Sequence, residues 1–207
     1  MPHQSLPANW QAPRLSGQHA SLEALTLAHV AGLQQALEGD ALSRLWYTNV
    51  PKQADAGVWV SVALEKHAQG IEVPFVVRDG NGTVVGSTRF YDVDPSVPKL
   101  SIGYTWYAPS VQRTGLNTEA KLLLLTHAFE TLGCVSVYLE TSWFNHASRT
   151  AIARLGAKQE GVLRNHRRHA DGTLRDTVVF SILDREWPGV KSNLSHRLEQ
   201  GAHRHDR

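Results

Sequence analysis

The sequence predicts an α/β fold in which a central mixed sheet, mostly antiparallel and of about seven strands, is flanked by helices. In the first half, consecutive β-rich runs are joined by a tight turn, which indicates hairpin-linked antiparallel strands. In the second half, strands alternate with helical segments, so neighbouring strands there need a helical crossover. The chain has 207 residues, of which 42% are hydrophobic. That length fits one domain with a sizeable core.

The first third of the chain is predicted to be mainly helical. Residues 1–13 are rich in proline and predict an extended segment, and the alternating residues 19–25 predict a first strand. Thr26 is a suitable N-cap for the helix that follows. Apolar residues at helical spacing predict three helical segments, which cover 27–37, 41–46 and 53–69.

Three consecutive strands are expected next, over 73–78, 83–92 and 100–107. The tetrapeptide Asp79-Gly80-Asn81-Gly82 joins the first two strands. Gly and Asn tolerate the positive φ angles that a tight hairpin turn demands, so this connection predicts an antiparallel pair.

The second half predicts a helix, a strand, a helix and a hairpin. These elements are expected over 116–132, 134–141 and 145–155, and the hairpin strands over 161–168 and 174–183. Gly133 and Gly156 are expected to end the two helices. Pro188 is expected to interrupt a last helical stretch, and residues 199–207 are expected to form a polar tail. The single domain would therefore span residues 14–198.

Composition excludes several classes of protein. Lys and Arg number 21 and Asp and Glu number 19, which gives a formal net charge of +2. This charge is weaker than that of a dedicated nucleic-acid binder. The single cysteine, Cys134, excludes a disulfide framework and a zinc site built on several thiolates, and its apolar strand predicts a buried side chain. Because no apolar run of about 18 residues and no signal-peptide pattern is present, we expect a cytoplasmic protein with no membrane partner.

The segment 102–120 carries the strongest indication of chemistry. A predicted strand ends at Pro109, a short polar turn with Gly115 follows, and a long helix begins. Backbone N–H groups at a helix start lack intrahelical partners and the helix dipole adds positive charge, so such a turn can bind a phosphate. Arg113 would add a side-chain charge. The alternative is an ordinary connection in which Thr114 is the N-cap.

The turn Gln112-Arg113-Thr114-Gly115-Leu116-Asn117 is similar to the acetyl-CoA signature Q/R-x-x-G-x-G/A of the GNAT superfamily of N-acetyltransferases. Its continuation, Thr118-Glu119-Ala120, resembles the RimJ/RimL-type branch of that superfamily. Two later blocks resemble the same branch: Asn145-His146-Ala147-Ser148-Arg149 with Leu155-Gly156-Ala157, and Glu160-Gly161-Val162-Leu163-Arg164 with Arg175-Asp176-Thr177. The resemblance covers residues 15–187 in element order, and three blocks in the right order make it specific.

The resemblance implies a GNAT-like fold in which two strands of the sheet splay apart and acetyl-CoA lies in the gap. Transferred to this sequence, Trp106 and Tyr107 would offer main-chain groups to the pantetheine. Asn145 and Ser148 would lie beside the pantetheine and the thioester. The pyrophosphate would be held by the signature turn, that is by Gln112, Arg113, Thr114, Gly115, Leu116 and Asn117.

The implied reaction moves the acetyl group of acetyl-CoA to a primary amine, on a protein N-terminus or a small molecule, by direct attack on the thioester. Ser148 and Asn145 would carry the catalytic roles. Ser148 would donate a proton to the departing thiolate, because Ile152 stands where many family members have a tyrosine. No metal is implied, and the family-level expectation is a monomer or a homodimer.

Two departures from the family pattern bear on these implications. Asn117 stands where the family prefers glycine or alanine, so the main chain would approach the pyrophosphate less closely. The strand around Ile102 supplies no acidic residue, so no general base is assigned. The nearest carboxylates by element are those of Asp92, Glu119 and Glu140, and Glu119 fits a capping role at the start of its helix better than a catalytic one.

Alternatives stay open. The missing acid is compatible with a non-catalytic CoA-binding or regulatory module. His166 and His169 share a spacing that two metal ligands can use, but without companions they predict a solvated hairpin rim. Aromatic residues of the early helices would line an acceptor pocket unless they belong to the core: Trp46, Tyr47 and Trp59. A basic cluster would attract an anionic substrate or nucleic acid unless it is an exposed hairpin face: Arg164, Arg167, Arg168 and Arg175.

Overall fold

A computed structural model describes residues 10–39 and 41–205, with side chains up to Gln200. Within these residues the strands form one sheet of eight, in the order β1-β2-β3-β4-β5-β6-β8-β7. The strands are β1 Leu15–Ser16, β2 Ala20–Ala24, β3 Glu72–Asp79, β4 Val84–Asp94, β5 Lys99–Tyr107, β6 Ser136–Ser142, β7 Lys158–Arg168 and β8 Leu174–Leu183. The mixed, mostly antiparallel sheet is confirmed, and the strand beyond the expected seven is the two-residue β1.

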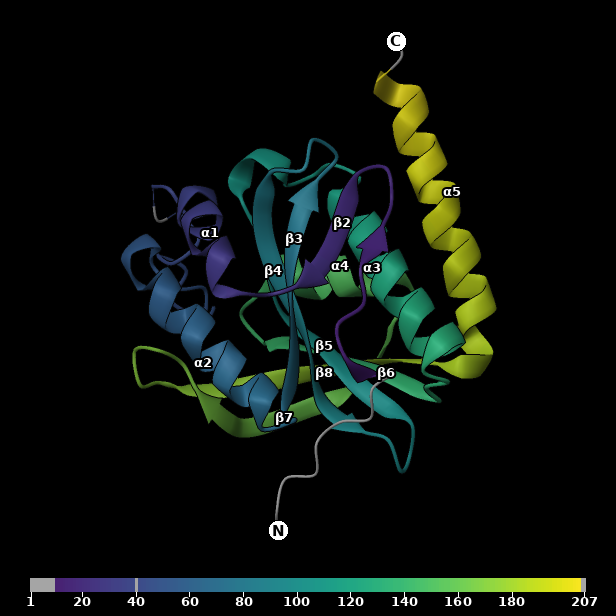
Figure 1. Cartoon of the computed structure of the whole chain (residues 1–207). Helices are drawn as coiled ribbons and strands as arrows, with labels where there is room; N and C mark the ends of the chain where they lie inside the picture. The colour runs from purple at the N-terminus through teal and green to yellow at the C-terminus, as the bar shows by residue number, and fades with distance from the viewer. Residues whose placement is uncertain (1–9, 40, 206–207) are drawn as a thin grey trace.

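Helices lie on both sides of this sheet (Figure 1). They are α1 Val30–Ala36, α2 Ala56–Ala68, α3 Leu116–Thr126, α4 His146–Leu155 and α5 Trp187–His205. Helices α1 and α2 pack against β4 and β3, whereas α3 packs against β2 and α5. Short helical turns precede or extend several helices: η2 Leu27–His29, η3 Gln53–Asp55, η4 Pro109–Val111, the π-helical η5 His127–Thr131 and η6 Asp184–Glu186.

The parallel pair β5 and β6 is the feature of the sheet that positions the site. Residues Lys99–Ser101 of β5 pair with Ser136–Tyr138 of β6, and no pairing continues beyond them. Helix α3 provides the crossover between these strands, as parallel neighbours require. The remaining halves of the two strands therefore separate, and each presents unpaired backbone to the gap.

Strand β5 also carries a bulge. Ser87 of β4 lies opposite Trp106, and Arg89 lies opposite Gly103, so β5 has one extra residue in this stretch. Tyr104 within it has a φ of 52°. A bulge leaves its extra residue outside the regular ladder and turns the following side chains. The strand is thereby re-aimed where it runs past β6.

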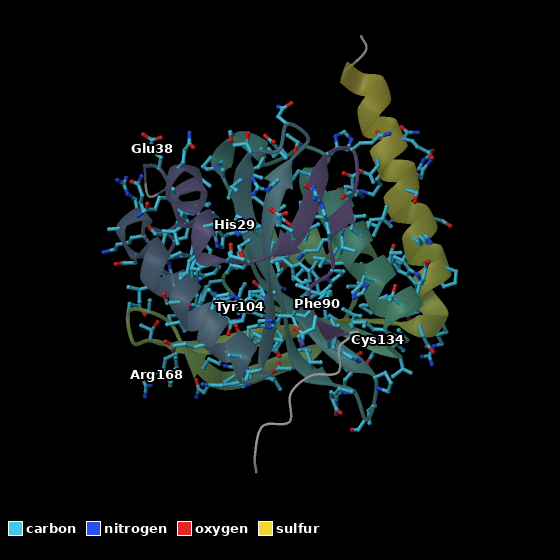
Figure 2. The ribbon with its side chains drawn as sticks, in the orientation of Figure 1. His29, Glu38, Phe90, Tyr104, Cys134 and Arg168 are labelled. Carbon is cyan, nitrogen blue, oxygen red and sulfur yellow. The ribbon has the colours of Figure 1, made fainter. Side chains whose placement is uncertain are left out.

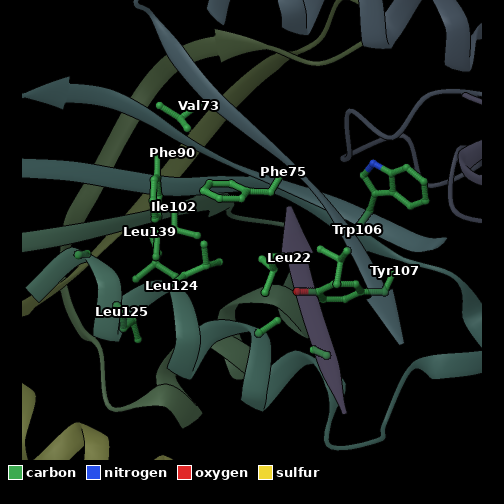
Figure 3. Packing of buried hydrophobic residues seen from close by; sticks show 14 of the residues in the cluster. Leu22, Val73, Phe75, Phe90, Ile102, Trp106, Tyr107, Leu124, Leu125 and Leu139 are labelled. Carbon is green, nitrogen blue, oxygen red and sulfur yellow. The ribbon is translucent and has the colours of Figure 1, made fainter. Parts of the chain in front are cut away.

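The core lies between the sheet and the helices and is continuous from β2 to α5. Phe75 and Phe90 pack edge to face, with ring centroids 5.1 Å apart, above Leu124 of α3 (Figure 3). Figure 2 shows Phe90 near the centre of the molecule and Glu38 at its periphery. Cys134 is buried, as predicted, and burial raises the pKa of its thiol to about 12.

Turn residues behave as their chemistry predicts. Gly82 has a φ of 82° in the turn between β3 and β4, and Gly156 has a φ of 103° directly after α4. The predicted hairpins and the glycine stop of α4 are therefore confirmed, because both glycines occupy the left-handed region that other residues avoid.

Three sequence predictions about local structure are wrong. Residues 41–46 form turns rather than a helical piece, and the Thr48 hydroxyl donates to the carbonyl of Leu45. Pro188 does not interrupt a helix but sits in the first turn of α5, where its missing N–H costs nothing. Helix α5 also continues to His205, through most of the expected tail 199–207. In the part of the chain that the structure describes, no helix is long and apolar enough to cross a membrane.

Candidate active site

A cavity of about 810 Å³ opens where β5 and β6 separate. Its walls are the second half of β5, the start of α3, the end of β6, helix α4, the hairpin β7–β8 and the segment 42–50. Most residues predicted to form the site line it: Trp106, Tyr107, Gln112, Arg113, Asn117, Asn145 and Ser148. Residues far apart in the sequence therefore meet in one place, because the unpaired strand ends lie between the two helices.

The turn before α3 presents backbone N–H groups that have no hydrogen-bond partner among the described residues. Arg113 has a φ of 64°. Among the described residues, no hydrogen-bond partner is found for the backbone N–H groups of Arg113, Thr114 and Gly115. Successive free N–H groups at the start of a helix make a concave, electropositive site. The Thr114 hydroxyl tightens the turn by donating to the Val111 carbonyl at 2.7 Å.

Three residues of the signature turn do not line the cavity, namely Thr114, Gly115 and Leu116. Thr114 is not the N-cap of α3, which is Gly115. A Cβ atom on Gly115 would lie 3.0 Å from Cδ2 of His19, so this glycine permits close packing of the turn on the start of β2. Leu116 is buried in the core.

Trp106 and Tyr107 point to opposite sides of β5 (Figure 3), as consecutive strand residues do. The Tyr107 carbonyl accepts a hydrogen bond from Nε2 of Gln112 at 3.1 Å, which fixes the turn against the end of β5. Trp106 Nε1 and the Tyr107 hydroxyl are buried with no partner among the described residues. Burial also raises the pKa of the Tyr107 hydroxyl, so this group stays protonated and able to donate.

Asn145 and Ser148 are joined by the cap of α4. The side-chain oxygen of Asn145 accepts from the backbone N–H of Ser148 at 3.0 Å. This is the usual N-cap interaction, and both residues line the cavity. The structure thus gives Asn145 a capping role, in addition to the binding and catalytic roles that the resemblance implied.

The three carboxylates considered in the sequence lie in different surroundings. Glu119 accepts from the backbone N–H groups of Gln18, His19 and Ala20, so it ties the start of β2 to α3. The Asp92 side chain lines a separate hollow of about 400 Å³ rather than the cavity. Glu140 lines both, and it is the one carboxylate among the described residues of the cavity.

Lys121 is a cavity residue that the sequence prediction missed. It is buried, and its Nζ donates to the Thr105 hydroxyl at 2.8 Å. Burial lowers the pKa of Lys121 to about 7, because the charged ammonium loses its hydration. The helical prediction over 116–132 contained the signal, since Lys121 follows Asn117 by four residues and shares its face.

Two tyrosines are further cavity residues that the sequence prediction missed. Tyr91 and Tyr104 line the cavity together with Arg167 and Arg175 of the hairpin β7–β8. Figure 2 shows Tyr104 near the centre of the molecule. Its ring is faced by the guanidinium of Arg89, 4.6 Å from the centroid. Burial raises the pKa of the Tyr91 hydroxyl, and the nearby carboxylate of Glu140 adds to the effect.

Of the early aromatic residues, Tyr47 lines the cavity, whereas Trp59 packs on Trp106. The predicted solvated rim is wrong for His169, which is buried against Trp46 with ring centroids 4.9 Å apart. Its Nε2 lies 3.5 Å from the Ser142 hydroxyl. No group of three metal-ligating side chains is found within the described residues.

A mixed sheet whose central parallel strands diverge over a cavity, beside a helix start with free N–H groups, is the arrangement that the resemblance to the GNAT acyltransferases implied. The family profile described as the acetyltransferase (GNAT) domain matches residues 20–158. The chain belongs to the GNAT acetyltransferase family, a family of acyltransferases, and the resemblance drawn from its signature blocks is confirmed.

Known relatives agree with this assignment. YdaF of Bacillus subtilis, provisionally named a ribosomal N-acetyltransferase, is 33% identical over 111 residues, which are 54% of this chain and 60% of YdaF. The crystal structure of a GCN5-related N-acetyltransferase from Brucella melitensis is 30% identical, with a TM-score of 0.81 over 92% of this chain and 90% of that one. RimJ of Mycobacterium smegmatis, solved with CoA-disulfide, shares the fold at 22% identity, with a TM-score of 0.75 over 91% of this chain and 96% of RimJ.

Proposed function

We propose that this protein transfers the acetyl group of acetyl-CoA to a primary amine. The observation that carries the proposal is the cavity at the divergence of β5 and β6, which Trp106, Arg113 and Asn117 line from one side and Asn145 and Ser148 from the other. Membership of the GNAT family and the free N–H groups before α3 support the same activity.

The residues present fit acetyl-CoA as the donor substrate. The free N–H groups of 113–115 and the guanidinium of Arg113 would hold its phosphates. The exposed backbone of β5 beyond Ser101 would pair with the amide groups of the pantetheine, since β6 does not use it. Asn117 lines the cavity and its side-chain amide can donate a hydrogen bond, which compensates for a bulkier residue at this position.

In the proposed reaction, a neutral amine nitrogen attacks the thioester carbonyl carbon, a C–N bond forms and the C–S bond breaks. The nitrogen loses one proton and the departing thiolate gains one. Ser148 is the proposed donor to the sulfur, because it lines the cavity and its backbone N–H is held by Asn145. Glu140 is the proposed acceptor of the amine proton, being the one carboxylate among the described cavity residues.

Thermal unfolding with and without ligand tests the first step. At about a hundred times its dissociation constant a ligand stabilises the native state by about 2.7 kcal/mol. We expect acetyl-CoA and CoA to raise the melting temperature, and NAD and ATP at equal concentration to have a smaller effect. Acetyl-CoA-dependent release of thiol in the presence of an amine then separates a transferase from a non-catalytic CoA-binding module.

A further inference from the structure

Two arginines face each other on the wall of the cavity opposite α3. Arg167 of β7 and Arg175 of β8 are directly paired in the antiparallel register, and both line the cavity. Like charges directly opposite each other destabilise a strand pair. Such a pair is retained at a cost to the fold unless something negative lies between or beside the two guanidinium groups.

The described residues of the cavity supply one carboxylate for these two guanidinium groups. Oε2 of Glu140 lies 3.1 Å from Nη2 of Arg167, and Glu140 is the one carboxylate on this wall. Nε of Arg175 is buried with no hydrogen-bond partner among the described residues. A buried charged donor without a partner is costly, so Arg175 is left in need of an acceptor.

Neighbouring groups do not neutralise Arg175 either. Behind Tyr104, the cations of Arg89 and Lys66 share the single carboxylate of Glu72, at 2.5 and 2.9 Å. Lys66 also lies over the Tyr104 ring, 5.7 Å from its centroid. Positive charge is therefore in excess on this side of the cavity, and beside Arg175 the register places the cation of Arg167, which the Glu140 carboxylate pairs.

The other arginines of the hairpin are satisfied outside the cavity. Arg164 is 80% exposed and pairs with Asp176, at 2.6 Å from Nε. Arg168, which Figure 2 shows at the periphery, donates to the Gly172 carbonyl at 2.9 Å. Neither lines the cavity. The basic cluster of the sequence is thus divided into two surface residues and two residues that face the site.

We propose that the amine acceptor carries a carboxylate close to its reacting amine, and that Arg175, assisted by Arg167, binds this carboxylate. The inference rests on the proposed acetyl transfer, in which Arg113 and the start of α3 take the phosphates of the donor. A guanidinium binds a carboxylate through two parallel N–H···O bonds, which gives orientation as well as affinity. The carboxylate is either the α-carboxylate of a free amino acid or the side chain of an acidic N-terminal residue of a peptide.

Matched acceptor pairs test the inference and separate the two sources. Tyrosine and tyramine differ in the α-carboxylate, and glutamyl-alanine amide and glutaminyl-alanine amide differ in a side-chain carboxylate. Thiol release from acetyl-CoA gives kcat/KM for each acceptor. We expect the carboxylate-bearing member of at least one pair to be favoured by about tenfold or more, in keeping with a charge-assisted contact. Equal kcat/KM values within both pairs would overturn the inference and leave the acetyl transfer intact.

Variants assign the preference to the arginine pair. In Arg175→Gln we expect KM of the favoured acceptor to rise about tenfold, while the values for its uncharged partner stay unchanged. Arg175→Lys keeps a positive charge and should retain part of the preference, which guards against a folding defect in the first variant. Arg164→Gln is the matched control and should behave as wild type.

A preference that survives in Arg175→Gln would overturn the role of Arg175. If no acceptor releases thiol and acetyl-CoA gives no thermal shift, the proposed function itself fails.

Discussion

Nζ of Lys121 in α3 lies 2.8 Å from the hydroxyl of Thr105 in β5. Thr105 in turn shares a hydrogen bond of 2.8 Å with Thr88 of β4. A buried lysine is thereby connected through two hydroxyl groups to the strands that form the cavity. This arrangement joins the start of α3 to the bulged part of β5, so the helix start and the strand that line the cavity are held as one unit.

Replacement of this lysine tests the cost of its burial. The folded-state pKa of Lys121 is lowered to about 7 from the ordinary 10.5. Between these values the unfolded chain binds more protons than the folded protein, so this group makes stability rise with pH. We expect Lys121→Met to be more stable than wild type at pH 7, by at least about 1 kcal/mol, and to lose that advantage towards pH 10.

Denaturant unfolding at several pH values measures this difference. Lys158→Met serves as the control, because Lys158 is exposed and should give a difference that does not vary with pH. A stability difference for Lys121→Met that is constant from pH 7 to pH 10 would show that folding does not lower the pKa of Lys121.

Gly115 allows α3 to begin against β2. A Cβ at this position would lie 3.0 Å from Cδ2 and 3.2 Å from Nε2 of His19. In Gly115→Val we therefore expect the turn to shift and acetyl-CoA to bind about tenfold more weakly, the effect of about 1.4 kcal/mol of overpacking. Isothermal titration measures the affinity. The double variant with His19→Ala should recover part of it, and equal affinities for wild type and Gly115→Val would remove this turn from the donor site.

Mutation can separate the proposed role of Ser148 as a proton donor from the role of Asn145 as the N-cap of α4. Because Asn145 accepts from the backbone N–H of Ser148, the cap survives in Ser148→Ala. We expect that variant to lower kcat by about tenfold to a hundredfold with unchanged acetyl-CoA affinity, through loss of proton donation to the thiolate. Asn145→Ala should instead destabilise the protein by about 1 kcal/mol, the cost of a lost cap. A Ser148→Ala enzyme with wild-type kcat would exclude the donor role.

Contiguous signals in the sequence predicted much of the fold. Gly82 and Gly156 each act within a few residues of their position, so local chemistry identifies them. The helical prediction over 41–46 was wrong because Trp46 packs on Phe144 and His169, and such contacts from distant elements override helical spacing. Pro188 was misjudged because its effect depends on whether it opens a helix or lies inside one.

The candidate site likewise has one part that the local sequence predicts and one part that it does not. The turn before α3 could be predicted because its residues are consecutive and its free N–H groups follow from the start of a helix. That Arg175 and Glu140 share one cavity could not be predicted, since they meet only through the pairing of β6 with β8 and of β8 with β7. The wall that carries Arg175 and Glu140 is assembled by strand pairing, whereas the turn before α3 is one continuous stretch of chain.

Glu140 offers the sharpest test of the proposed proton acceptor. The amine must be neutral to attack, and Glu140 is the one carboxylate among the described cavity residues that can take up its proton. Glu140→Gln keeps the size of the side chain and an oxygen for Arg167, so the fold should be retained. We expect kcat to fall about a hundredfold. KM for a carboxylate-bearing acceptor should stay equal or decrease, because the variant leaves Arg167 without its counter-charge.

Steady-state kinetics with tyrosine measures both constants. Glu160→Gln is the control, since Glu160 lines only the separate hollow and bonds Ser181. An unchanged kcat in Glu140→Gln would mean that water carries the proton away, and a raised KM would mean that Glu140 contacts the acceptor itself.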